Sequence, residues 1–133
     1  LVFAEEIRRG EGLAAWILDD GVAAELTLAS EGGFLPTGAA TLPNGDVLLL
    51  ERRFSFLGGF AARLRRIPRA EIAPGATLTG REIATLAPPL TTDNFEAISV
   101  VPLSDGSSLV FLLSDDNFSA LQRTLLLLFR LPE

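Results

Sequence analysis

The chain has 133 residues, of which 48% are hydrophobic, and its seventeen acidic and eleven basic side chains give a formal net charge of −6. This length and apolar content predict a globular domain rather than a disordered chain. The acidic balance argues against nucleic acid as a partner and favours a cation. His, Cys, Tyr, Met and Lys do not occur, which excludes Ser-His-Asp triads, Cys nucleophiles, His/Cys zinc sites and Schiff bases within this chain, and leaves carboxylate, arginine and hydroxyl chemistry.

The cellular setting is constrained only in part. No apolar run approaches the roughly 18 residues that a membrane span needs, so we predict no membrane span. A chain without Cys fits a reducing compartment or an exported bacterial protein that uses no disulfides. It starts at Leu1 without Met or a visible signal peptide, so we expect a longer precursor and treat the chain as a fragment.

The first thirty residues predict three strands, near 1–7, 13–18 and 23–28, separated by Gly-containing turn signals. Asp20-Gly21 stands between two of these segments and is typical of a β-hairpin turn. We interpret residues 1–30 as the end of a preceding sheet.

A strand–turn–strand unit then occurs twice, at residues 38–54 and, slightly longer, at residues 96–118. Each copy reads as a short strand, a Gly turn, a strongly apolar strand and a cluster of charge closed by Phe. Repetition at this scale indicates a repeated supersecondary unit. Residues 51–53 and 115–117 hold the same place in the two units, so we expect both charge clusters on one rim of the fold.

The two units predict two successive antiparallel sheets. Strands near 37–42, 46–54, 60–67 and 81–86 form the first, within residues 34–87, and strands near 96–102, 108–115 and 123–131 begin the same sheet again, within residues 93–131. Residues 47–50 and 109–113 are apolar at every position, so both faces of those strands should be covered. Stacked propeller blades provide such cover.

We therefore predict an all-β chain that forms an incomplete, propeller-like array of antiparallel four-stranded blades. About two and a half blades would fill one domain at residues 1–133. Such an array leaves strand edges with unpaired backbone groups until the ring of blades is complete. The rest of the propeller is therefore an expected partner.

Short motifs along the chain are similar to those of the bacterial phytase-like domain described as "esterase-like activity of phytase". They occur in the family's order at residues 34–38, 48–52, 93–96, 114–118 and 122–124. The resemblance covers about residues 13–131 and corresponds to the C-terminal part of that domain. Ala97 stands where the family usually carries Gly.

The resemblance implies an exported, propeller-like protein, periplasmic or secreted, whose N-terminal part supplies the remaining blades. It also implies activity on a phosphate or carboxylate ester.

If the two charged loops meet on one rim, several carboxylates would gather there. Clustered carboxylates favour a hard cation such as Ca²⁺, which takes six to eight oxygen ligands. The predicted metal ligands are Asp93, Glu96, Asp115, Asp116 and Glu51. The alternative is that residues 115–117 form a turn whose side chains cap backbone groups.

Glu96 is the predicted general base, and a bound ion could polarise an ester and activate water. Arg52, Arg123 and Asn117 are the predicted substrate-binding residues, because a guanidinium fork suits phosphate or carboxylate. The alternative for Glu96, Glu51 and the arginines is a structural ion pair. Residues 63–69 carry further arginines, which we interpret as a solvated outer strand.

Three functions stay open on these residues. The first is part of a metal-assisted ester hydrolase. The second is a non-catalytic propeller of the bacterial envelope that binds a ligand or protein through the same rim. The third is a structural segment whose acidic loops only hold blades together.

Overall fold

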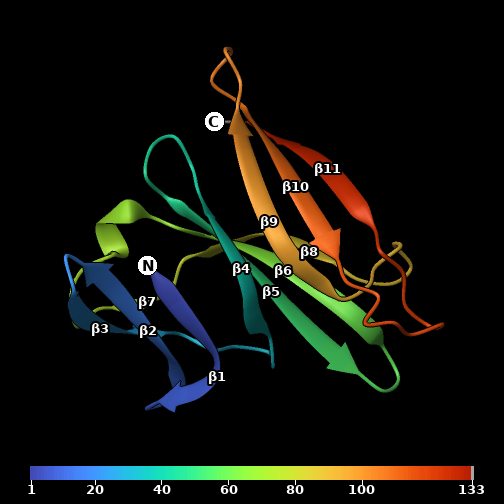
Figure 1. The fold of residues 1–133 in the computed structure, drawn as a ribbon, viewed down its shortest axis with the longest axis horizontal. Coiled ribbons are helices and arrows are strands. Elements are labelled where there is room, and N and C mark those ends of the chain that lie inside the picture. Colours follow the sequence, from blue (N-terminus) through green and yellow to red (C-terminus); the bar gives the residue numbers. More distant parts are fainter. Residues whose placement is uncertain (133) are drawn as a thin grey trace.

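The computed structural model describes residues 1–132, so the last residue of the predicted domain range 1–133 lies outside the described residues. The described chain is built from β-strands and one short 3₁₀ turn, η1 (Arg69–Glu71), which confirms the all-β prediction (Figure 1). The strands are β1 (Val2–Arg9), β2 (Gly12–Asp19), β3 (Val22–Leu28), β4 (Leu35–Thr41), β5 (Val47–Ser55), β6 (Gly59–Ile67), β7 (Thr77–Leu78), β8 (Arg81–Leu86), β9 (Phe95–Pro102), β10 (Ser108–Ser114) and β11 (Leu126–Leu131).

These strands form three sheets, which follow one another along the chain except that β7 joins the first. The N-terminal sheet has the order β1-β2-β3-β7, the central sheet β4-β5-β6-β8, and the C-terminal sheet β9-β10-β11. The sheets stack face against face, and none of the three closes on itself within residues 1–132 (Figure 1). No part of residues 1–132 is coiled into a helix long and apolar enough to cross a lipid bilayer.

The central sheet is covered on both faces, as the uniformly apolar residues 47–50 predicted. Val47 and Leu49 belong to one core cluster with Leu13 and Leu26 of the N-terminal sheet. On the other face, Leu48 and Leu50 pack in a second cluster with the C-terminal sheet. Successive side chains of a strand point to opposite faces, so a run without alternation is the sequence signature of this middle position.

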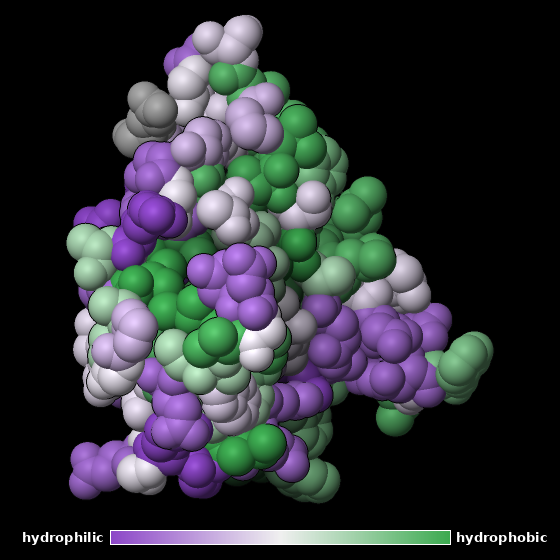
Figure 2. All heavy atoms as spheres, turned by 60° about the vertical axis from the view of Figure 1, so that its left-hand side comes forward, coloured by the Kyte–Doolittle hydropathy of each residue, from purple (hydrophilic) through white to green (hydrophobic). Residues whose placement is uncertain are grey.

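The N-terminal sheet contains the hairpin that Asp20-Gly21 predicted. Both turn residues have positive φ, 43° and 79°, as a two-residue type I′ turn requires. Its fourth strand, β7, comes from the Pro/Gly-rich segment between β6 and β8 and pairs in parallel with β3, which the sequence pattern did not indicate. The side of the molecule that this sheet occupies shows hydrophobic patches beside hydrophilic residues (Figure 2).

The C-terminal sheet is covered on one face only within residues 1–132. Val110 and Leu112 are buried against the central sheet, whereas the opposite face exposes Leu113, Leu126 and Leu128 by 43%, 65% and 56%. The expectation that both faces of residues 109–113 are covered is therefore wrong for the described chain. The uniformly apolar residues 109–113 indicate that both faces of the strand are suited to packing, but they do not indicate whether residues 1–132 supply the cover for the second face.

The two repeated units have the same turn. In the first, the N–H of Leu42 donates to the carbonyl of Asp46 and the N–H of Gly45 to that of Leu42. In the second, Leu103 bonds Ser107 and Gly106 bonds Leu103 in the same way. Gly45 and Gly106 both have a φ of 87°, a conformation that glycine adopts without strain. The predicted repeat is thus confirmed down to its backbone hydrogen bonds.

Candidate functional site

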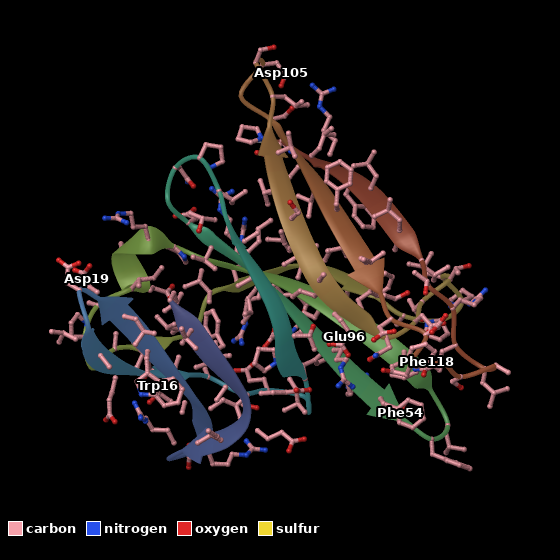
Figure 3. The ribbon with its side chains drawn as sticks, viewed as in Figure 1. Trp16, Asp19, Phe54, Glu96, Asp105 and Phe118 are labelled. Atoms are coloured by element: carbon pink, nitrogen blue, oxygen red, sulfur yellow. The ribbon has the colours of Figure 1, made fainter. Side chains whose placement is uncertain are left out.

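Arg52 of β5 links carboxylates from the two flanking sheets. Its Nη2 lies 3.0 Å from Oε1 of Glu5 on β1, and its Nε lies 3.2 Å from Oε1 of Glu96 on β9. The side chains of Arg52, Glu5 and Glu96 are 27%, 45% and 36% exposed, so small solutes can reach them. A groove between β1, β4 and β9 runs past both carboxylates. One cation and two acids from three sheets therefore meet at this place, and Figure 3 shows the position of Glu96.

The close approach of β4 and β9 holds Glu96 in this place. A Cβ on Gly38 of β4 would lie 3.2 Å from Cγ2 of Ile98 and 3.4 Å from the carbonyl oxygen of Glu96, so only a residue without a side chain fits comfortably there. The hydroxyl of Thr37 also donates to the carbonyl of Phe95 at 2.9 Å. These contacts fix the start of β9 against the central sheet and bring Glu96 beside Arg52.

Glu51 lies in the interior and not on the rim. It is fully buried, and its carboxylate accepts from Nε of Arg63 at 2.8 Å and from Nη2 of Arg65 at 2.6 Å. The pairing of neighbouring strands brings these groups together, since Glu51 on β5 stands opposite Arg63 on β6. Glu51 therefore forms a structural ion pair, which was the alternative to its role as a metal ligand. Its partners are Arg63 and Arg65 and not the arginines that the sequence suggested.

Arg63 and Arg65 correct the interpretation of residues 63–69 as a solvated strand. They are 7% and 5% exposed and face the N-terminal sheet, where Arg65 Nη1 donates to the carbonyls of Ala29 and Thr79 at 2.9 Å. Arg63 also stacks on the ring of Phe34, 4.4 Å from its centroid, a favourable cation–π geometry. Their role is to tie the first two sheets together.

Asp93 organises the loop between β10 and β11. Its carboxylate is buried and accepts from the backbone N–H of Asn94 and of Arg123, both at 2.9 Å. The Arg123 side chain, 61% exposed, places Nε 3.7 Å from the same carboxylate. Ser114 supports this arrangement because its hydroxyl donates to the carbonyl of Arg123 and accepts from the N–H of Leu125.

Asp115 and Asp116 form the turn that was the alternative to a metal site. Their carboxylates accept from the backbone N–H groups of Asn117 and Phe118 at 3.0 and 2.9 Å, and both donor residues have positive φ. Asn117 Nδ2 contacts Gln122. Asn117 and Arg123 therefore belong to this loop and not to the groove beside Arg52, so the four predicted substrate and catalytic residues divide between two places.

The residues present do not fit a Ca²⁺ site made by this chain alone. Within residues 1–132, no group of three or more acidic side chains is arranged to hold a metal ion. Each predicted ligand also has other partners: Glu51 and Glu96 contact arginines, Asp93 caps backbone N–H groups, and Asp115 and Asp116 cap their own turn. Calcium binding stays a prediction.

The family model described as esterase-like activity of phytase matches residues 12–118, most of the chain. The chain belongs to the phytase-like family. No curated protein and no solved structure matches it.

In this phytase-like chain, Glu5 is the site residue that sequence reasoning missed. It comes from β1, outside the matched residues 12–118, and lies 47 positions before its partner Arg52. Glu5 lies next to a second acidic residue, Glu6, on a largely exposed strand, and this pattern carries no local signal of such a contact. Only the stacking of the N-terminal sheet on the central sheet brings the two together.

Proposed function

We propose that this phytase-like chain contributes part of a site that hydrolyses a phosphate or carboxylate ester. The observation that supports it is the meeting of Arg52, Glu5 and Glu96 at the groove between the three sheets. Membership of the phytase-like family supports the same reaction class.

The chemistry follows from the three groups. A guanidinium binds the oxygens of an anionic ester through its N–H donors, and such a ligand at Arg52 competes with the carboxylates already there. Glu96, released from Arg52, can accept a proton from a water molecule as that water attacks the phosphorus or carbonyl carbon. The ester bond then breaks, and the departing alkoxide takes the proton back from Glu96. Glu5 stays on Arg52 and fixes its orientation.

The wider setting is part of the same proposal. The three stacked sheets are consecutive blades of a propeller-like domain, and further blades come from the N-terminal part of that domain. The protein is exported to the periplasm or beyond. Calcium assistance would need ligands in addition to those that this chain brings together, so the proposed steps do not depend on it.

The test replaces Glu96 by Gln and measures hydrolysis of chromogenic phosphate and acetate esters, with and without Ca²⁺. Loss of a general base should lower kcat by about 10²-fold or more at unchanged melting temperature, since Glu96 is partly exposed. Asp19→Asn is the matched control, because Asp19 is exposed at the end of β2 in the N-terminal sheet (Figure 3). Equal activity of Glu96→Gln and wild type would remove Glu96 from the mechanism.

A second function, a non-catalytic propeller of the bacterial envelope, is favoured by a different observation. Phe56 and Leu57 at the tip of the β5–β6 hairpin are 95% and 98% exposed, and Phe118 and Leu121 in the β10–β11 loop are fully or nearly fully exposed. Phe54 and Phe118 both lie toward the end of the molecule that carries Glu96 (Figure 3). Exposed apolar side chains of this kind are typical of binding surfaces. Absence of hydrolysis in wild type and in Glu96→Gln would favour this function.

A further inference from the structure

The N-terminal sheet repeats the central sheet, shifted by one strand. β2 and β6 both begin Gly-x-Ala-Ala, at residues 12–15 and 59–62, and β3 and β8 share Ala-x-Leu, at residues 24–26 and 84–86. The pairing agrees with the sequence, because Ala15 stands opposite Leu26 as Ala62 stands opposite Leu86. β2 and β3 therefore take the places of β6 and β8, the third and fourth strands of the central sheet.

It follows that β1 takes the place of β5, the second strand. Arg9 stands opposite Gly12 as Ser55 stands opposite Gly59. Residues 1–3, Leu-Val-Phe, recur as residues 109–111 on β10, the second strand of the C-terminal sheet. The arrows in Figure 1 agree, because β1 runs opposite to the first strands β4 and β9. Within residues 1–132, the N-terminal sheet has no counterpart of β4 and β9.

The place of this missing first strand is an open groove. β1 pairs with β2 along one edge, and no strand of residues 1–132 pairs with its other edge. The groove beside that edge is lined by Val2, Phe3 and Glu5 of β1 and by residues 36–39 at the start of β4. An unpaired edge presents backbone N–H and C=O groups that readily accept another strand.

We propose that the free edge of β1 binds an extended strand of the β4 and β9 type, antiparallel to β1. Like β9, whose Ile98 and Val100 pack toward the central sheet, it would carry apolar side chains at alternate positions. The source is the same polypeptide, because β4 and β9 are each joined to the next strand by a short turn, residues 42–46 and 103–107. This inference rests on the propeller part of the proposed function. The strand would fill the groove along residues 1–3 and begin beside Glu5, so the groove would stay open only at the end where Glu96 and Arg52 lie.

The experiment fuses a second copy of residues 93–108 directly before Leu1. This junction reproduces the native Ser108-Leu109-Val110-Phe111, since Leu1-Val2-Phe3 follows. Hydrogen exchange of the β1 amides should slow by about ten-fold or more relative to the original chain, and the melting temperature should rise. The matched control is the same fusion with proline in place of the copied Ile98 and Val100, because proline cannot donate to the ladder.

Unchanged β1 exchange in a fusion that is folded, or equal protection in the proline control, would overturn the proposal. Protection at β10 in place of β1 would also overturn it, because the added strand would then have replaced β9. A free peptide of residues 93–102 provides the other arm: if it protects β1 while the fusion does not, the strand comes from a separate chain and the same-chain source is wrong. The fusion experiment measures hydrogen exchange and melting temperature and does not measure ester hydrolysis. Its failure can therefore be distinguished from a failure of the mechanism proposed for Glu96.

Discussion

At the scale of the residue, Glu51 joins two buried arginines at the interface between the first two sheets. It neutralises one of two buried arginines, and Nη2 of Arg63 and Nε of Arg65 are already buried without hydrogen-bond partners. Replacing Glu51 by Gln leaves both cations buried without a counter-charge, which typically costs about 3 kcal/mol or more. We expect Glu51→Gln to lower the free energy of unfolding by this amount in urea denaturation, and the melting temperature by about 10 °C.

Glu25→Gln is the control for that measurement. Glu25 also pairs with an arginine, Arg9, at 2.9 Å, but its side chain is 70% exposed, and exposed ion pairs contribute about 1 kcal/mol or less. If the two variants lose the same stability, the Glu51 pair contributes no more than an exposed one, and the role assigned to Arg63 and Arg65 is wrong.

At the scale of the element, Glu71 fixes the short strand β7. Burial would raise the pKa of its carboxyl, but hydrogen bonds from the N–H groups of Gly80 and Thr79 and from the Thr79 hydroxyl outweigh burial, so the pKa is lowered. A lowered pKa in the folded state means that the stabilisation is complete above the ordinary Glu value and is lost as the pH falls below about 4.

We therefore expect the amides of residues 77–80 to exchange faster at pH 3 than at pH 6, after correction for intrinsic exchange. Glu71→Gln should remove most of this difference, because it has no charge to lose. Glu82→Gln is the control, since Glu82 is exposed and its carboxylate accepts from the nearby Thr85 hydroxyl. A pH effect that persists in Glu71→Gln would assign the acid sensitivity of β7 to another group.

The elements that sequence reasoning predicted are those with local signals. Asp20-Gly21 and the turns around Gly45 and Gly106 need positive φ, and the sequence names residues that supply it. Long-range relations were not predictable in this way. The burial of Arg63 and Arg65 depends on the strand register that sets Arg63 opposite Glu51, and the Arg52–Glu5 contact depends on how two sheets stack. A run of arginines in a sequence is interpreted as a solvated strand as long as the position of its acidic partner is unknown.

The same contrast governs the candidate site. Glu96 and Arg52 were predicted from their positions near strand ends, and the structure places them 3.2 Å apart. Asp93 and the residues 115–117 were predicted for the same place, but their hydrogen bonds hold a separate loop. Sequence order indicated a shared rim, whereas side-chain partners within that rim follow from contacts across three sheets.

At the scale of the whole molecule, the uncovered face of the C-terminal sheet should control solubility. Phe111 stands opposite Leu128, and Leu113 opposite Leu126, so these side chains form a contiguous apolar surface, and such surfaces promote association. We expect Leu128→Ser, at a position 56% exposed, to reduce concentration-dependent light scattering with little change in the free energy of unfolding. Leu127→Ser is the matched control on the same strand: Leu127 packs against the core, so it should cost about 2 kcal/mol of stability. Scattering that is equal in Leu128→Ser and wild type would show that association proceeds through another surface, such as the apolar loop tips near Phe56 and Phe118.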